Sequence, residues 1–360
     1  MTPAALRLTS GKTIGHGLPC FLVAEIGNNH QGRLELAEEL VRAAAKAGAD
    51  AVKFQKRDVA ALLTRAGRTA SYRGPNSFGP TYGAHRQALE LDFEELAALK
   101  ALSESLGLTF FASAWDEPSL DGLLKLKVEL LKVASADLTS LPLIRRMVRS
   151  GLPIIASTGM SRWPEIDAAV AELTASHRQV VLLHCNSSYP TADREICLPV
   201  MLELARRYEL PVGYSGHELG YAPSLAAAAL GACLVERHFT LDKTLPGTDH
   251  GASLTPAEFA EMAAMTRQIE RACTGSAKRI FSGEAASARK LKKAIVAARD
   301  LAAGTVLAPG DLAIKCPADG LPTLFWDDVK GLTLLADLAR DEPLRWELLD
   351  AAGRRASSDA

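Results

Sequence analysis

The sequence predicts an α/β protein: a (β/α)8 TIM barrel followed by a small C-terminal domain. Between about residues 21 and 272, short apolar runs alternate with amphipathic stretches, which is typical of strands and helices on a parallel sheet. There are eight such runs, whereas a doubly wound sheet usually has about five or six. After Cys273 the alternation stops and a polar, basic segment follows. The chain therefore divides into a large barrel and a smaller unit.

The predicted strands are apolar runs that end near polar residues. They are Phe21–Ile26, Ala51–Gln55, Leu108–Ser113, Leu130–Ser135, Leu152–Ser157, Val180–Cys185, Leu210–Ser215 and Cys233–His238. The stretches between them have helical periodicity. In the first, Leu36, Leu40 and Ala43 share one face, and Gly48 supplies a stop.

One connection is unusually long. It runs from about Arg57 to Leu91 and is rich in Gly, Pro, Ser and Tyr. Because it follows a strand, it belongs to the catalytic face of a barrel, and we expect a lid or substrate loop. The alternative is a passive surface insertion.

We expect four segments along the chain: the barrel over residues 1–275, a linker over 276–290, the small domain over 291–351 and a disordered tail over 352–360. The small domain carries short strand and turn patterns, then a short helix near Phe325 to Val329.

Composition excludes some classes of function. The chain has 41 basic and 42 acidic residues, so no overall field favours nucleic acid or an anionic membrane. It has no signal-peptide pattern and no apolar run of about 18 residues, which predicts a soluble, cytoplasmic protein. Its six scattered cysteines form no CxxC pair and are expected to be reduced thiols.

Polar residues occur at nearly every predicted strand end, where a barrel places its functional side chains. They are Glu25, Lys53, Gln55, Ser113, Lys132, Ser135, Ser157, His184, Ser215, His217, Glu236 and His238. Any one of them could serve only a structural salt bridge. Their repetition predicts one shared pocket.

Two features of this set indicate its chemistry. His217 and His238 close neighbouring strands, and with Glu236 and Asp249 nearby they predict a divalent metal with positions left for water and substrate. Lys53 and Lys132, with the serines, are suited to a phosphate and a carboxylate. No P-loop or GxGxxG motif is present, so a nucleotide is not expected.

These residues lie in motifs that resemble the sialic acid (N-acetylneuraminate) synthase family. The motifs, in chain order, are AEIGNNHQG (24–32), AVKFQK (51–56), TYGAHRQALE (81–90), LKVASADLTSLPLI (131–144), STGM (157–160), HCNSSYPT (184–191), GYSGHELG (213–220) and ERHFTLDKTLPGTDHGASL (236–254). The segment from about residue 290 to 349 resembles that family's antifreeze-like (SAF) domain.

The resemblance implies a transferase that condenses phosphoenolpyruvate with N-acetylmannosamine, its 6-phosphate or a related amino-sugar aldehyde and releases phosphate. It also implies a domain-swapped homodimer. By position, it assigns Mn²⁺ or Mg²⁺ to His217 and His238; phosphoenolpyruvate to Lys53, Ser113, Lys132, Ser135, Ser157, Ser187 and Ser215; the sugar to Gln55, Tyr189 and Asp249; and catalysis to Glu25, Lys53, Asp137 and Glu236. Glu25 and Asp137 are both candidates for handling the proton of the attacking water.

Three departures leave the sugar open. Cys316 stands where bacterial members that use free N-acetylmannosamine carry an arginine, and Asp137 and Ser187 replace the usual glutamate and asparagine. The stretches ASAD, TYGAHR and TDHGAS look closer to members that use the 6-phosphate. Precursors of pseudaminic and legionaminic acid are also possible acceptors.

Three other functions compete with this one. Another phosphoenolpyruvate–aldose condensation would share the barrel without needing the terminal domain. A metal-dependent barrel hydrolase would use His217 and His238 to activate water, but would not need so many phosphate-holding residues. A non-catalytic carbohydrate-binding or ice-binding protein would have little use for metal ligands and both lysines.

Overall fold

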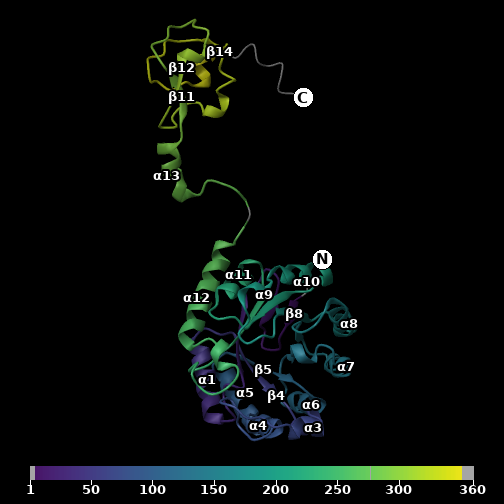
Figure 1. The fold of residues 1–360 in the computed structure, drawn as a ribbon. Helices are drawn as coiled ribbons and strands as arrows, with labels where there is room; N and C mark the ends of the chain where they lie inside the picture. The colour runs from purple at the N-terminus through teal and green to yellow at the C-terminus, as the bar shows by residue number, and fades with distance from the viewer. Residues whose placement is uncertain (1–4, 276, 351–360) are drawn as a thin grey trace. The chain divides into compact units, whose positions relative to one another are not determined.

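The computed structural model describes residues 5–275 and 277–350, which form two compact units (Figure 1). The first unit ends at Thr274 and the second begins at Gly275. The residues of the predicted disordered tail, 352–360, lie outside the described part. No helix in the described ranges is both long and apolar enough to cross a membrane.

The first unit is a closed barrel of eight parallel strands, which confirms the predicted fold class. The strands are β3 (Phe21–Gly27), β4 (Ala51–Lys56), β5 (Thr109–Ala114), β6 (Leu131–Val133), β7 (Ile154–Ser157), β8 (Val180–Cys185), β9 (Val212–Gly216) and β10 (Leu234–His238). Each pairs with the next along the chain, and β10 pairs with β3 to close the barrel.

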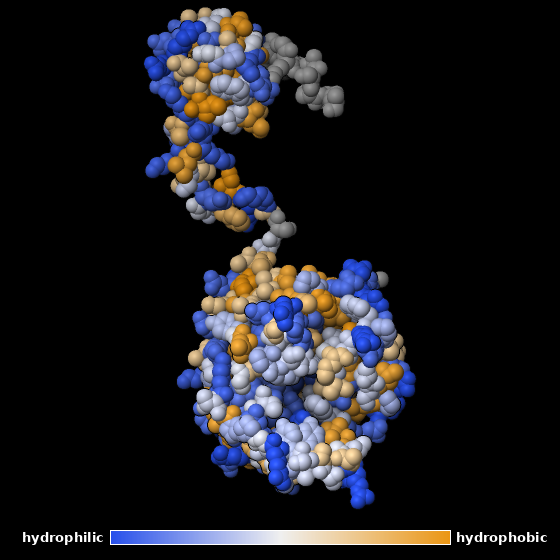
Figure 2. Space-filling model, in the orientation of Figure 1, coloured by the Kyte–Doolittle hydropathy of each residue, from blue (hydrophilic) through white to orange (hydrophobic). Residues whose placement is uncertain are grey.

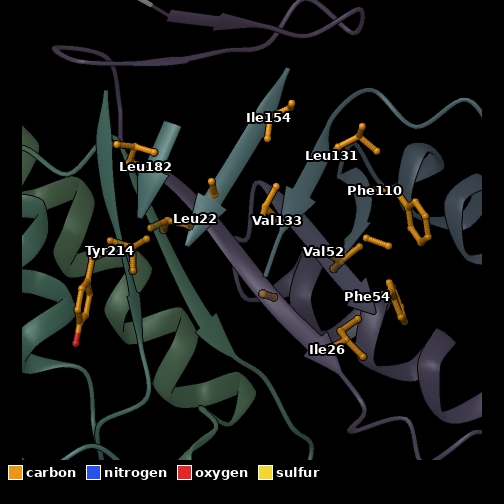
Figure 3. Close-up of a cluster of buried hydrophobic side chains, with 14 of the residues drawn as sticks. Leu22, Ile26, Val52, Phe54, Phe110, Leu131, Val133, Ile154, Leu182 and Tyr214 are labelled. Carbon is orange, nitrogen blue, oxygen red and sulfur yellow. The ribbon is translucent and has the colours of Figure 1, made fainter. Parts of the chain in front are cut away.

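Helices surround the strands (Figure 1). They are α1 (Leu34–Lys46), α5 (Phe93–Ser105), α6 (Glu117–Lys125), α7 (Leu141–Arg149), α8 (Trp163–Leu173), α10 (Pro199–Tyr208), α11 (Ala222–Ala229) and α12 (Pro256–Ala272). Side chains that alternate along the strands pack against them. Figure 3 shows Leu22, Ile26, Val52 and Phe54 in this layer.

The inward-facing side chains form two layers of opposite character. The layer nearer the amino ends of the strands is apolar. It includes Val23, Phe111 and Val181, which pack with Leu6 and Ile14. The last two come from a hairpin of β1 (Ala5–Arg7) and β2 (Thr13–Gly15). The hairpin therefore completes the apolar half of the barrel interior.

Nearer the carboxyl ends of the strands, every strand contributes one inward-facing residue that is polar or ionisable. These residues are Glu25, Lys53, Ser113, Lys132, Ser157, Cys185, Ser215 and Glu236. His184 does not belong to this ring, contrary to the sequence prediction. It lies between the inward residues Leu183 and Cys185, so it faces outward, where its Nε2 lies 2.6 Å from the carbonyl oxygen of Ile196.

The long connection after β4 contains three short helices, α2 (Val59–Leu62), α3 (Arg65–Thr69) and α4 (Tyr82–Ala88). Asp58, Thr64 and Thr81 cap them through their side chains. Other short helices follow later strands: η1 (Ser135–Asp137), α9 (Asp193–Ile196) and η2 (His250–Ala252).

The second unit contains a helix and two antiparallel strand pairs. The helix, α13 (Ser282–Leu291), begins in the predicted linker and ends one residue beyond it; the strands are β11 (Ala294–Ala297), β12 (Leu312–Lys315), β13 (Thr333–Leu334) and β14 (Leu349–Asp350). Short 3₁₀ turns, η3 (Pro309–Asp311), η4 (Thr323–Phe325) and η5 (Trp346–Leu348), join them. The helix expected near Phe325 to Val329 is thus a 3₁₀ turn that starts two residues earlier, directly after Pro322.

A buried ion pair links β10 to the loop after β9. Arg237 and Glu218 have fully buried side chains, and Arg237 Nη1 lies 2.8 Å from Glu218 Oε1. Arg237 also donates to the carbonyl oxygens of Glu218 and Gly220, while Tyr214 donates to Glu218 Oε2. These bonds offset the cost of burying both charges.

Glu218→Gln is expected to lower the free energy of unfolding by about 3–5 kcal/mol, because it leaves the Arg237 charge buried without its counter-ion. Urea unfolding followed by far-UV circular dichroism measures the loss. The control is Glu203→Gln, whose exposed pair with Arg206 should contribute less than about 1 kcal/mol. Equal small losses in the two variants would contradict a structural role for the buried pair.

Candidate functional site

A polar cavity of about 610 Å³ opens at the carboxyl ends of the barrel strands. Its lining includes the whole ring of inward residues and nearly all of the residues that the sequence singled out. Those present are Glu25, Lys53, Gln55, Ser113, Lys132, Ser135, Ser157, Ser187, Tyr189, Ser215, His217, Glu236, His238 and Asp249. Asp137 is the one predicted site residue that does not line it.

Lys53 lies between two buried carboxylates. Its Nζ is 2.9 Å from Glu25 Oε2 and 3.4 Å from Glu236 Oε1. Gln55 donates to the other oxygen of Glu25 at 2.7 Å, and Ser215 donates to Glu236 at 3.1 Å. Closure of the barrel creates this triad, because β3 pairs with both β4 and β10.

The two carboxylates of the triad differ in acidity. Burial raises the pKa of Glu25, and the attraction of Lys53 offsets this only in part. Burial also acts to raise the pKa of Glu236, but Lys53 and Lys132 outweigh it and hold that pKa below its ordinary value. Glu236 is therefore the more acidic carboxyl, and Glu25 the better proton donor.

Lys132 has no carboxylate within 4.0 Å among the described residues. Its Nζ donates to Ser157 Oγ at 2.7 Å and to the carbonyl oxygen of Val133 at 2.9 Å. Burial lowers its pKa to about 8. A buried ammonium group beside hydroxyl donors is suited to an anionic ligand.

The STGM turn after β7 lies against two more serines of the lining. A Cβ atom at Gly159 would lie 2.5 Å from Ser187 Oγ and 2.7 Å from Ser135 Oγ. Glycine at this position therefore lets both hydroxyls approach the turn closely.

Asp137 lies in η1, beside the cavity rather than in its lining. Burial raises its pKa to about 7, against the attraction of Lys132 and Arg57. Its Oδ2 is buried and makes no hydrogen bond. Its charge can act on Lys132, but the structure does not place its oxygens at the cavity wall.

The structure brings His217 and His238 together, with ring centroids 5.3 Å apart. His217 Nδ1 lies 2.6 Å from the carbonyl oxygen of Asn186, which can only accept, so Nδ1 carries the proton and Nε2 is left as a donor atom for an ion. Burial lowers the pKa of His238 to about 3, so this ring is neutral near pH 7. Its buried Nδ1 has no hydrogen-bond partner and lies 3.8 Å from Asp249 Oδ2.

Two adjacent imidazoles, of which His238 is neutral near pH 7 and has an unpaired buried nitrogen, fit a divalent metal. Burial acts to lower the pKa of His217, but Cys185 and the carbonyl of Asn186 outweigh it and raise that pKa, so an ion would have to displace a proton from this ring. Across residues 5–275 and 277–350, no group of three or more His, Cys, Asp and Glu residues is arranged to hold an ion. An ion bound here would therefore take further ligands from water or substrate. Tyr189 covers this pair, with its ring centroid 4.0 Å from that of His217.

The sequence analysis did not single out several residues of the lining. Arg57, Arg86, Asn28, Asn76, Trp115, Met160, Cys185 and Thr248 belong to it. Arg57 is held by Glu90 at 2.8 Å and by the ring of Trp115, whose centroid is 4.5 Å from the guanidinium carbon. The sequence did offer a signal for each arginine: Arg57 directly follows the AVKFQK strand, and Arg86 lies within the TYGAHR motif.

Comparison with family models identifies both units. The model described as the NeuB family matches residues 40–278, and the SAF domain model matches residues 292–350. These matches confirm the resemblance that the motifs indicated.

Relatives match over nearly their full lengths. The human N-acetylneuraminate-9-phosphate synthase is 36% identical over 99% of this chain and 100% of its own. An N,N'-diacetyllegionaminic acid synthase of Legionella pneumophila is also 36% identical, over 96% of this chain and 99% of its own. The crystal structure of a Leptospira borgpetersenii N-acetylneuraminic acid synthetase, in complex with citrate, is 33% identical with a TM-score of 0.69 and covers 79% of this chain and 94% of its own.

We expect affinity for phosphoenolpyruvate to fall above about pH 8 by up to tenfold per pH unit, because Lys132 is a cation only below its lowered pKa. Isothermal titration calorimetry between pH 7 and 9.5 measures this. Lys132→Arg should flatten the profile, since guanidinium stays charged throughout. The same slope in both proteins would show that another group controls binding.

Proposed function

Because the chain belongs to the NeuB family, we propose that it is a nonulosonic (sialic) acid synthase that joins phosphoenolpyruvate to an amino-sugar aldehyde and releases phosphate. It is an enzyme of the phosphoenolpyruvate-dependent transferase type. The observation that carries the proposal is the single cavity in which two lysines, a row of serines and two adjacent imidazoles meet. A weak carbon nucleophile with two anionic groups needs such cations, and its aldehyde partner needs activation.

The chemistry divides between two ends of the cavity. Lys132 and the hydroxyls of Ser113, Ser135, Ser157, Ser187 and Ser215 would hold the phosphate and carboxylate of phosphoenolpyruvate. Gln55, Tyr189 and Asp249 would bind the sugar. Carbon 3 of phosphoenolpyruvate then attacks the aldehyde carbon, and carbon 2 becomes an oxocarbenium ion. Water adds at carbon 2, and collapse of the resulting adduct releases phosphate and leaves a ketone.

Glu25, Lys53 and Glu236 would handle the protons. Glu25 lines the cavity and has the raised pKa of the pair, so it is suited to protonate the aldehyde oxygen as that oxygen becomes a hydroxyl. Between the two candidates for the water proton, Glu25 is favoured over Asp137, which lies outside the lining. Lys53 holds Glu25 and Glu236 in place.

His217 and His238 would hold Mn²⁺ or Mg²⁺. When bound, the ion would supply Lewis-acid activation of the aldehyde. The Nδ1 hydrogen bond of His217 to Asn186 fixes the orientation of that ring and leaves Nε2 as the nitrogen that would bind the ion.

We place the enzyme in the cytoplasm as a homodimer in which the SAF domain of one copy covers the barrel mouth of its partner. Large apolar side chains exposed on the second unit support such a contact: Leu324, Val306 and Leu335 are 85%, 60% and 57% exposed. Figure 2 shows apolar residues among hydrophilic ones on that unit. The free thiol of Cys185 in the cavity suits a reducing compartment.

The proposed function has two alternatives. Synthesis of a pseudaminic- or legionaminic-type acid would use a diacetamido sugar, and the identity to the Legionella relative favours including it. A metal-dependent hydrolase would leave the phosphate-holding serines and Lys132 without a role, so it is the weaker candidate.

Incubation with phosphoenolpyruvate, Mn²⁺ and a panel of aldehydes tests the function. We expect phosphate release that depends on an amino-sugar acceptor: N-acetylmannosamine, its 6-phosphate or a diacetamido-trideoxyhexose. The product mass should equal that of acceptor plus pyruvate. Mannose 6-phosphate, which lacks the amino group, is the control. Acceptor-independent phosphate release, or none at all, would overturn the proposal.

His238→Ala should weaken Mn²⁺ binding by at least 10- to 100-fold, which is the range seen when even an outer partner of a metal ligand is removed. Electron paramagnetic resonance of free Mn²⁺ measures binding without turnover. The matched control is His184→Gln, because His184 is on β8 of the same barrel but faces out of it. Unchanged Mn²⁺ affinity in His238→Ala would remove the metal assignment.

A further inference from the structure

The cavity has four lysine and arginine side chains in its lining, and only two of them are neutralised. Lys53 is paired with Glu25 and Glu236, and Arg57 is paired with Glu90. Lys132 and Arg86 have no carboxylate within 4.0 Å in the part of the chain that the structure describes. Two unpaired cations in one cavity indicate two anionic groups among its ligands.

The two unpaired cations occupy different ends of the cavity. Lys132 is on strand β6, in the ring of inward residues. Arg86 is on α4 of the long connection, and it also lines a small adjoining cavity with Thr248 and Asp249. Asp249 lies beside His238, so Arg86 lines the cavity near the imidazole pair and comes from a connection, whereas Lys132 comes from a barrel strand.

The guanidinium of Arg86 is already oriented. Its Nε and Nη2 both donate to the hydroxyl of Tyr82, at 2.9 and 2.7 Å, and the Tyr82 ring centroid is 5.0 Å from its central carbon. The Tyr82 hydroxyl thus occupies the side edge of the guanidinium, which Nε and Nη2 form. The end edge, which Nη1 and Nη2 form, is left for a ligand. Two parallel N–H donors are the geometry that binds phosphate in a bidentate manner.

Neutral donors lie at the same end of the cavity. Asn76 accepts from the backbone nitrogen of Gly247 at 3.0 Å through Oδ1, which leaves its amide hydrogens available. The Thr248 hydroxyl also lies here, but it donates its hydrogen to Asp249 Oδ1 at 2.7 Å. The amide of Asn76 is therefore the neutral donor left for a ligand beside this cation.

Building on the proposed function, we propose that Arg86 binds a phosphate ester on the acceptor sugar, at the end remote from the aldehyde. The acceptor is then a phosphorylated amino sugar. Its aldehyde lies at the imidazole pair and its phosphate at Arg86, while Lys132 takes the anionic groups of phosphoenolpyruvate. A neutral acceptor would leave the end edge of the guanidinium without an anion.

Steady-state kinetics with N-acetylmannosamine and its 6-phosphate test the assignment, with phosphoenolpyruvate and Mn²⁺ saturating. The wild-type enzyme should prefer the 6-phosphate. Arg86→Gln should raise KM for the 6-phosphate by on the order of 10- to 100-fold, the effect of losing hydrogen bonds to a charged group. The KM for phosphoenolpyruvate and the kinetics with the unphosphorylated sugar should not change.

Three further variants isolate the guanidinium. Arg86→Lys keeps the charge and should recover part of the loss. Tyr82→Phe keeps Arg86 but removes the hydroxyl that orients its guanidinium. It should raise KM for the 6-phosphate by about 2- to 10-fold. The matched control is Arg68→Gln, which removes an exposed arginine of α3 in the same connection and should leave all constants unchanged.

The outcomes separate this inference from the proposed function. Preference for the unphosphorylated sugar, or an equal loss with both sugars in Arg86→Gln, overturns the phosphate site and leaves the synthase standing. An equal loss would mean that Arg86 acts on Asp249 instead. A rise in KM for phosphoenolpyruvate would assign Arg86 to that substrate and also overturn the inference. Absence of phosphate release with every amino sugar overturns the proposed function itself.

Discussion

The pairing of β10 with β3 is the constraint on which the site depends. Along a strand, alternate side chains face the barrel interior, and closure places the last strand beside the first. His238 is thereby aligned with Glu25, and Glu25 with Lys53. A lysine and two carboxylates from distant parts of the sequence then meet in one buried group. An open sheet would leave Glu236 at the opposite edge from Glu25, and Lys53 would be buried with a single counter-ion.

Arg237, which faces outward between Glu236 and His238, helps to fix the positions of the two imidazoles. Arg237 binds Glu218, and these two residues directly adjoin His238 and His217. Any shift of the loop after β9 would therefore break a buried ion pair as well as move His217. Because the guanidinium also binds the carbonyl oxygens of Glu218 and Gly220, the loop backbone is held at several points. The ion pair thus serves the geometry of the site as well as stability.

Much of the barrel could be predicted because strand period and helix period are local properties. The same reasoning failed where it had to decide which alternate residues of a strand face inward. His184 lies near the end of a strand, but Leu183 and Cys185 take the inward positions. Asp137 was included on family position alone, and the turn at η1 leaves it beside the lining. Arg57 and Arg86 were not singled out, because their connection has no repeat and only tertiary packing brings it over the strand ends.

Charge pairing also bears on how the cavity would hold two anionic substrates, as the proposed phosphate site on Arg86 requires. Lys53 is nearest to the carboxylates and is neutralised twice, so it offers little attraction to a further anion. Lys132 has no carboxylate within 4.0 Å among the described residues and is hydrogen-bonded to a neutral serine, so its charge remains available. The charge of Arg57 is neutralised by its ion pair with Glu90. Among the four lysine and arginine side chains of the lining, Lys132 and Arg86 are therefore the two without an ion pair in the described part of the chain. Under the proposed function, this arrangement separates the anionic groups of the two substrates while their reacting carbons meet in the middle.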